Sequence, residues 1–236
     1  MKTFNIKKKN NIILEDQIIK PKIKTSRQEF QLIKQSLNEN LALHSVQRHL
    51  SVLKLEEYLL IIALVTTAVL GRILLQPLAS IEPITFIALL AGSLFGLRKG
   101  AFVGASSWYL SNFFMFGGQG PWTIVHIANG ILAGAIGGLF LRKPTVLKSI
   151  IAITLSTIIF ELSINIMSGV LFYGIITSFI TAIPFAITHL VSNILFSVSL
   201  PRSRTTILKK GKLDEIVMCE KFIQKLKQKR VETNEV

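Results

Sequence analysis

The sequence has few charged residues and almost no cysteine. Charged side chains make up 17% of its 236 residues, against about 25% in soluble domains. Apolar residues make up 50% and the mean hydropathy is +0.52, which excludes a disordered chain, a fibrous chain and most soluble enzymes. Cys219 is the single cysteine, so a disulfide framework and a thiolate zinc site are also excluded. The composition is that of a protein buried largely in lipid.

The sequence also lacks the motifs of common catalytic sites. It contains no Gly-x-x-x-x-Gly-Lys-Ser/Thr, so it has no P-loop with which to hydrolyse ATP. The stretch Gly104-Ala105-Ser106-Ser107 and the distant His189 would suit an intramembrane serine protease only if Ser106 and His189 lie within hydrogen-bond reach. Otherwise Ser106 is an ordinary packing residue. We expect no enzymatic activity, no cofactor and no metal site.

The basic residues lie mostly near the two ends of the chain. Of 27 Lys and Arg residues, 21 fall within 1–55 and 201–236. This distribution predicts cytoplasmic tails around a membrane domain. The basic segments lack the interleaved aromatic residues of a base-stacking surface, so we expect no nucleic-acid partner. The predicted parts are a basic N-terminal extension over 1–56, a membrane domain over 57–200 and a basic C-terminal tail over 201–236.

Six apolar segments predict an all-α, polytopic membrane protein that folds as a six-helix bundle. A hydrocarbon core of about 30 Å is crossed by about 20 helical residues. The loops after the second, fourth and sixth segments carry Lys or Arg, whereas those after the first, third and fifth carry neither. The positive-inside rule therefore places both termini in the cytoplasm and the protein in the cell membrane. The expected spans are residues 58–75, 83–96, 101–116, 123–141, 149–167 and 176–200, the last of them interrupted by Pro184.

Both tails contain helical patterns. Ser26-Arg27-Gln28-Glu29 has the form of a capping box and predicts a short helix over residues 27–40, after a flexible segment over 1–25. Spaced apolar residues between Leu213 and Leu226 predict a basic amphipathic helix, which lies either on the anionic membrane surface or against a partner protein.

Small residues recur every four positions within three of the predicted spans. Such ridges let helix backbones approach closely in lipid. They serve either packing within the bundle or docking of another membrane subunit. The ridges are Gly92 with Gly96, Ala101 with Ala105, and Gly130 with Gly134 and Gly138.

Polar residues gather toward the end of the bundle that carries the uncharged loops. Polar groups in a span are costly and often functional, so we predict a ligand-binding cavity that opens outward. In it, Trp122 would stack on a ligand ring and Arg72 would meet a ligand oxygen. Alternatively, Arg72 pairs with Glu82, Glu161 bonds a neighbouring amide, and Trp122 only anchors the protein at the membrane interface. The candidate site residues are Arg72, Glu82, Asn112, Gln119, Trp122, His126, Glu161 and Asn165.

Residues 71–141 resemble the membrane-embedded substrate-binding (S) components of energy-coupling factor (ECF) vitamin transporters, in particular the cobalamin-type branch. The matching stretches are Gly71-Arg72, Ile81-Glu82-Pro83-Ile84-Thr85 and Gly118-Gln119-Gly120-Pro121-Trp122-Thr123. The resemblance implies capture of a vitamin or related micronutrient, cobalamin among the candidates, from outside the cell. It also implies a transmembrane coupling (T) subunit and two cytoplasmic ATPase subunits as partners.

Two other functions remain open from the sequence. One is a membrane scaffold or assembly protein that binds no small molecule. The other is a proton-coupled secondary carrier that uses Glu161 and His189. Inverted repeats would favour the carrier, and the sequence shows none.

Overall fold

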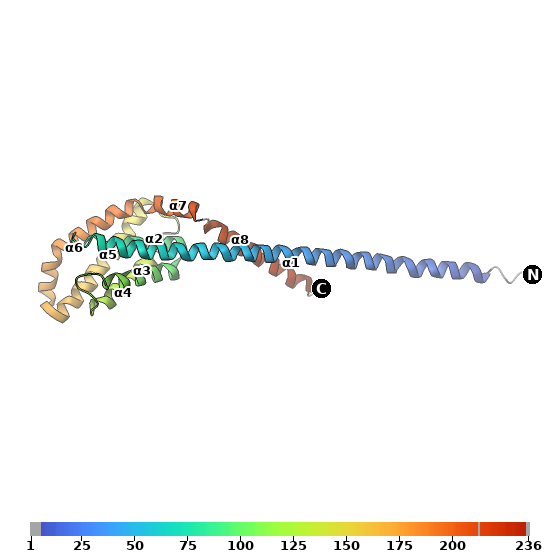
Figure 1. The fold of residues 1–236 in the computed structure, drawn as a ribbon, viewed down its shortest axis with the longest axis horizontal. Helices are drawn as coiled ribbons and strands as arrows, with labels where there is room; N and C mark the ends of the chain where they lie inside the picture. Colours follow the sequence, from blue (N-terminus) through green and yellow to red (C-terminus); the bar gives the residue numbers. More distant parts are fainter. Residues whose placement is uncertain (1–5, 212, 235–236) are drawn as a thin grey trace, which may run out of the picture. The chain divides into compact units, whose positions relative to one another are not determined.

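The computed structural model describes residues 6–211 and 213–234, and it describes side chains from Phe30 onward except at positions 32, 33, 35, 36, 39, 40, 214, 227 and 229–234. Every element in these residues is helical, as the sequence predicts (Figure 1). The elements are α1 (Ile6–Leu74), α2 (Ile84–Phe95), α3 (Leu97–Asn112), α4 (Trp122–Phe140), α5 (Val146–Ser168), the π-helical turn η1 (Gly169–Tyr173), α6 (Ile175–Val198), α7 (Leu200–Lys210) and α8 (Leu213–Asn234).

The chain divides into two compact units. The first comprises Met1–Val52 and Glu215–Val236, and the second comprises Leu53–Asp214. Within the first unit, His49 Nε2 lies 3.6 Å from Glu215 Oε2, and both side chains are about half exposed. We call the second unit the membrane unit, because it contains all six predicted spans.

Helix α1 differs from the sequence prediction for the N-terminal extension. A flexible segment over 1–25 and a separate helix over 27–40 were expected, but α1 is continuous from Ile6 to Leu74. The chain has no glycine before Gly71 and only one proline, Pro21, in that stretch, so residues that end helices are rare there. The capping-box side chains, and residues 1–5 altogether, lie outside the described part.

Each of the six predicted spans coincides with a helix or with the end of one. Within the described residues, four helical segments are long and apolar enough to cross a membrane, namely Leu41–Leu74, Trp122–Phe140, Val146–Tyr173 and Ile175–Val198. Helix α2 is a shorter apolar helix. Helix α3 begins four residues earlier than expected, and Lys99 in its first turn lies 2.7 Å from Glu57 of α1. The protein is thus an all-helical bundle suited to a membrane.

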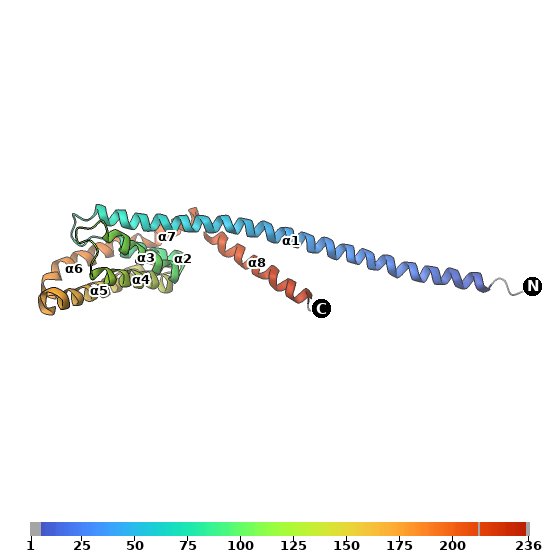
Figure 2. The ribbon, with the colours of Figure 1, turned by 60° about the horizontal axis from the view of Figure 1, so that its bottom comes forward.

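Close backbone contacts join α2, α3 and α4, which lie side by side in Figures 1 and 2. A Cβ atom built on Gly104 would lie 2.1 Å from the carbonyl oxygen of Gly130, and one on Gly92 would lie 2.1 Å from that of Gly134. Only glycine allows this approach. Of the two expected uses of the small residues, these glycines serve packing within the bundle.

Helix α7 extends the membrane unit beyond the expected boundary at residue 200. Leu200 is fully buried, and Arg204 Nε donates to the carbonyl oxygen of Ser93 at 3.1 Å. A cationic group at this point satisfies a carbonyl in the last turn of α2. The predicted C-terminal tail is therefore two helices, of which α7 packs with the bundle.

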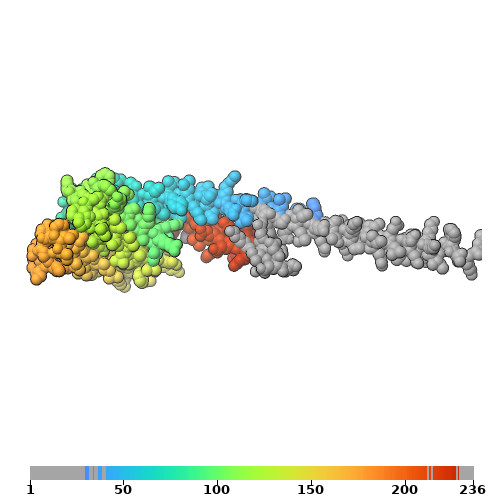
Figure 3. Space-filling view, turned by 90° about the horizontal axis from the view of Figure 1, so that it is seen from below, coloured from blue at the N-terminus to red at the C-terminus, as the bar shows by residue number. Residues whose placement is uncertain are grey.

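The outer surface of the membrane unit is strongly apolar along α5 and α6. Figure 3 shows the segment from η1 into α6, in orange, at one end of this surface. Pro184 lies inside α6, where it removes one backbone hydrogen bond. Large apolar side chains exposed on these helices suit contact with lipid tails, and they include Ile151, Ile158, Leu162, Ile176, Ile180, Ile183 and Ile187.

Candidate functional site

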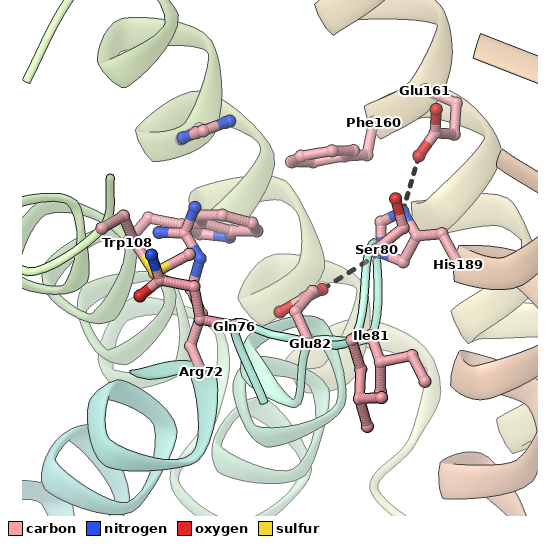
Figure 4. Close-up of a pocket in the computed structure, with 12 residues that line it drawn as sticks. Arg72, Gln76, Ser80, Ile81, Glu82, Trp108, Phe160, Glu161 and His189 are labelled. Atoms are coloured by element: carbon pink, nitrogen blue, oxygen red, sulfur yellow. Dashed lines mark hydrogen bonds and ion pairs between the residues drawn. The ribbon is translucent and has the colours of Figure 1, made fainter. Parts of the chain in front are cut away.

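A cavity of about 200 Å³ opens at one end of the membrane unit (Figure 4). Its walls come from five helices, α1, α3, α4, α5 and α6, and from the connections before α2 and before α4. Neither of these connections carries Lys or Arg. The lining residues are Arg72, Gln76, Leu78, Ser80, Ile81, Glu82, Trp108, Met115, His126, Phe160, Glu161 and His189.

Arg72 is held firmly at one side of the cavity. Its Nη1 atom donates to Ser111 Oγ at 2.7 Å and to Asn112 Oδ1 at 2.6 Å. Its guanidinium carbon lies 4.3 Å from the ring centroid of Trp108, within the range of a cation–π contact. Among the described residues, all hydrogen bonds of this guanidinium come from Nη1. The N–H groups of Nε and Nη2 thus remain available to a bound molecule.

Three aromatic rings pack together beside Arg72. The rings of Trp108 and Phe160 are stacked with centroids 5.1 Å apart, and His126 lies 4.5 Å from Trp108 and 5.5 Å from Phe160. Trp108 is 2% exposed and Phe160 is 8% exposed. Offset stacking of this kind stabilises the cluster beyond the area it buries. It gives the cavity a rigid apolar wall.

Two carboxylates and an imidazole form a chain on the other side of the cavity, in which His189 and Glu82 are buried and Glu161 is 18% exposed. His189 Nδ1 lies 2.6 Å from Glu161 Oε1, and His189 Nε2 lies 3.2 Å from Glu82 Oε1. We call these three residues the Glu–His–Glu triad; the dashed lines in Figure 4 mark its contacts. Glu82 also accepts hydrogen bonds from the Thr85 hydroxyl and from the first backbone N–H groups of α2, a favourable position for a carboxylate.

The triad carries one negative charge in either arrangement of its protons. A neutral imidazole offers one N–H donor, and an ionised carboxylate offers none. Contacts at both ring nitrogens therefore require an imidazolium between two carboxylates, or a neutral imidazole with one protonated carboxyl group. The net charge of the three side chains is the same in both arrangements, so the triad is a negative group opposite Arg72 whichever arrangement holds.

Four predicted site residues line the cavity: Arg72, Glu82, His126 and Glu161. Asn112 lies one contact behind them, where it accepts from Arg72 and donates to Thr123 Oγ1 at 3.1 Å. The expected alternative pairing of Arg72 with Glu82 is replaced by the contact of Glu82 with His189. The expected amide contact of Glu161 is present, since Asn165 Nδ2 lies 3.3 Å from Glu161 Oε2.

Three predicted residues do not line this cavity. Gln119 is exposed and donates to the carbonyl oxygen of Tyr109. Trp122 donates to the carbonyl oxygen of Gly118, and its ring packs over Gly120 in its own loop. Asn165 borders a separate apolar groove between α5 and α6. Trp122 was expected to stack on a ligand ring, but it lies outside the lining of this cavity.

The predicted ligand site did not include Trp108, Phe160, Gln76 or His189, and His189 was named only for the carrier alternative. Trp108 had a usable signal, since it precedes Asn112 by four residues on α3 and so shares a helix face with it. Gln76 lies in the turn just after the end of α1, four residues beyond Arg72. For Phe160, the sequence offered no signal beyond its position next to Glu161. The protease hypothesis lacks its geometry, because Ser106 donates to the carbonyl of Phe102 while both ring nitrogens of His189 contact carboxylates.

Comparisons with known proteins identify a family. Searches among curated proteins and among solved structures found no match. The sequence profile of a family of unknown function, DUF6580, matches residues 53–210, about two thirds of the chain. The match begins where the membrane unit begins, ends four residues before the unit ends, and includes every residue that lines the cavity. The chain therefore belongs to the DUF6580 family.

Proposed function

We propose that the membrane unit is the substrate-binding S component of an ECF-type importer, and that its cavity captures a small micronutrient from outside the cell. One observation carries the proposal. A cavity with a held arginine, an aromatic wall and the Glu–His–Glu triad lies at the end of the bundle whose connections carry no Lys or Arg. Membrane pockets of this chemistry, buried among apolar helices, are typical of ligand sites.

The distribution of charge supports an outward-facing cavity. Arg98 and Lys99 lie in the first turn of α3, and Arg142 and Lys143 lie in the connection between α4 and α5, all at the opposite end of the bundle. The positive-inside rule assigns such basic turns to the cytoplasm. The proposal thus includes six crossings of the cell membrane, with α2 and α3 as short crossings, and cytoplasmic termini.

The size of the cavity favours a small ligand over a macrocycle. A cavity of about 150 Å³ holds benzene, so the 200 Å³ here suits one ring with a few substituents. A corrin such as cobalamin is several times larger. We therefore propose a vitamin-like molecule with a single ring as the ligand.

The proposal requires partners, because the sequence contains no P-loop. ATP-driven uptake would need a transmembrane coupling subunit and two cytoplasmic ATPase subunits. The small-residue contacts between α2, α3 and α4 are used within the bundle, so a docking face for the coupling subunit would lie on other helices.

A second candidate function is favoured by the triad. Chains of carboxylates and histidine inside membrane helices are common in proton-coupled carriers, and Glu161 and His189 are in direct contact here. A carrier would move its ligand without ATP or partner subunits, so transport by the isolated chain separates the two functions. A scaffold that binds nothing would have no use for the free donors of Arg72.

The test combines ligand identification with transport. Native mass spectrometry of the purified chain should reveal a bound small molecule without added ATP. Liposomes that contain only this chain should show no concentrative uptake, with or without a proton gradient. Uptake driven by a proton gradient would establish the carrier instead, and purification of a chain that never carries a ligand would refute both.

The orientation can be tested separately with single-cysteine reporters in a background without the native cysteine. A cysteine at Gln119 should react with an impermeant thiol reagent added outside intact cells, because the connection before α4 lies at the outer end. A cysteine at Lys143 should react only after permeabilisation. The opposite labelling pattern would turn the cavity toward the cytoplasm and refute capture from outside.

A further inference from the structure

We infer that the molecule bound in this cavity is a single-ring carboxylate whose two oxygens are received by Arg72 and Gln76. The inference rests on the proposed function and narrows it to a class of ligand. It follows from the unfilled donors of the cavity, the placement of its charges and its aromatic wall.

Two donor groups on one side of the cavity lack protein acceptors. The Nε and Nη2 groups of Arg72 make no hydrogen bond within the described residues, as noted above. Gln76, one helical turn further along the chain, has a buried Nε2 atom without a hydrogen-bond partner in the same residues. A buried unpaired donor is costly, so a structure retains one where a ligand fills it.

The positions of these donors favour a planar anion with two oxygens. Arg72 and Gln76 lie on the same side of the cavity in Figure 4, and a guanidinium with two free N–H directions binds a carboxylate through paired hydrogen bonds. A phosphate ester would bring a charge of about −1.5 to −2, which the single positive charge of Arg72 does not balance and the negative triad repels. A carboxylate is therefore the acceptor that fits best.

The opposite side of the cavity fixes the direction of the ligand. Glu161 and His189 lie there (Figure 4), and the triad repels an anion because it carries one negative charge in either proton arrangement. The carboxylate thus faces Arg72, and the ring of the ligand lies against Trp108 and Phe160, whose side chains supply the apolar wall.

The test uses simple probes of one size and different charge. Purified protein in lipid nanodiscs is titrated with benzoate, benzamide, benzylamine and phenyl phosphate, and the Kd of each is measured by calorimetry. Benzoate should bind at least about tenfold more tightly than the other three, because only it offers a charged, two-oxygen acceptor of the right size. Equal binding of benzamide or benzylamine, or no binding of benzoate, would overturn the inference.

Variants test the two donors. Arg72→Gln should weaken benzoate binding about 10- to 100-fold, and Arg72→Lys should retain part of it because the charge stays. Gln76→Leu should weaken benzoate several-fold while the ligand-free protein becomes no less stable to heat, because the change removes an unpaired buried donor. Lys143→Gln removes one positive charge at the opposite end and is the matched control, with unchanged benzoate affinity.

The outcomes separate this inference from the proposed function. If Gln76→Leu lowers the stability of the ligand-free protein and leaves benzoate affinity unchanged, Gln76 is structural and the inference fails. If native mass spectrometry finds a bound molecule without a carboxylate, the ligand class is wrong but the S-component proposal stands. If neither a copurified molecule nor any probe binds, both are wrong.

Discussion

Replacement of the central histidine tests how strongly the triad holds the bundle together. In His189→Leu the two carboxylates lose their shared partner, although both remain in the bundle. Removing one partner of a buried ion pair costs about 3–5 kcal/mol, because the remaining charge is left uncompensated. The imidazole is 3% exposed and touches two carboxylates, at 2.6 and 3.2 Å, so we expect a loss in the upper part of that range.

A second substitution should restore part of the lost stability. Glu161→Gln in the His189→Leu background removes one of the two uncompensated acids, and coupled neighbours of this kind interact by about 0.5–3 kcal/mol. The free energy of unfolding is measured by sodium dodecyl sulfate titration of protein in mild detergent, followed by circular dichroism. Ser192→Ala is the control on the same helix, since its hydroxyl donates only to the carbonyl of His189, and it should cost about 1 kcal/mol or less.

Two results would refute this account of the triad. One is a His189→Leu variant as stable as the wild-type protein. The other is a Glu161→Gln substitution that lowers stability by the same amount in both backgrounds, because additivity would mean that the side chains do not interact.

Two further pairs of variants test the packing of the bundle and its aromatic wall. Gly104→Ala should lower the free energy of unfolding by about 1–3 kcal/mol, because the new Cβ would lie 2.1 Å from a backbone oxygen. Gly117→Ala is the control and should change it by less than about 0.5 kcal/mol, because its Cβ would meet nothing closer than 3.9 Å. Equal effects of the two substitutions would refute the close contact. Trp122→Phe should leave Trp108 as the only tryptophan, with fluorescence that benzoate quenches at wild-type affinity, whereas Trp108→Phe should weaken benzoate binding and abolish the quenching. Quenching of Trp122 alone would move the ligand to the loop before α4.

Much of the fold follows from the sequence because its causes are local. Each apolar run of helical length forms a helix, and the loop charges mark alternate connections without any knowledge of packing. Two exceptions differ in origin. Lys99, in the first turn of α3, has an acidic partner in Glu57, 42 residues away, so a basic stretch that was expected to be a loop is helical through a distant contact. Helix α1 continues through the extension, where the chain has no glycine and Pro21 as its single proline.

The site was predicted less completely because it depends on contacts between distant helices. Glu82 and His189 are 107 residues apart, and the sequence offers no rule that joins them. The spacing of polar residues selected the end of the bundle where the cavity lies and four of the side chains that line it. The sequence could not show that Trp122 hydrogen-bonds to Gly118 in its own loop. It also could not show that Trp108, which lies on α3, forms the aromatic wall of the cavity.

The glycine contacts between α3 and α4 close the cavity on that side of the bundle. They begin beside Trp108, where Gly130 meets Gly104, and continue one turn at a time through Gly134 against Gly100 to Gly138 against Leu97. A gate normally opens by rotation of side chains, but the contact between α3 and α4 is made of backbone atoms, so it contains no side chain that could rotate to open a path. If the proposed uptake function holds, a captured molecule that leaves toward the cytoplasm must therefore pass elsewhere, along α5 and α6, or travel with the whole bundle as it reorients in the lipid.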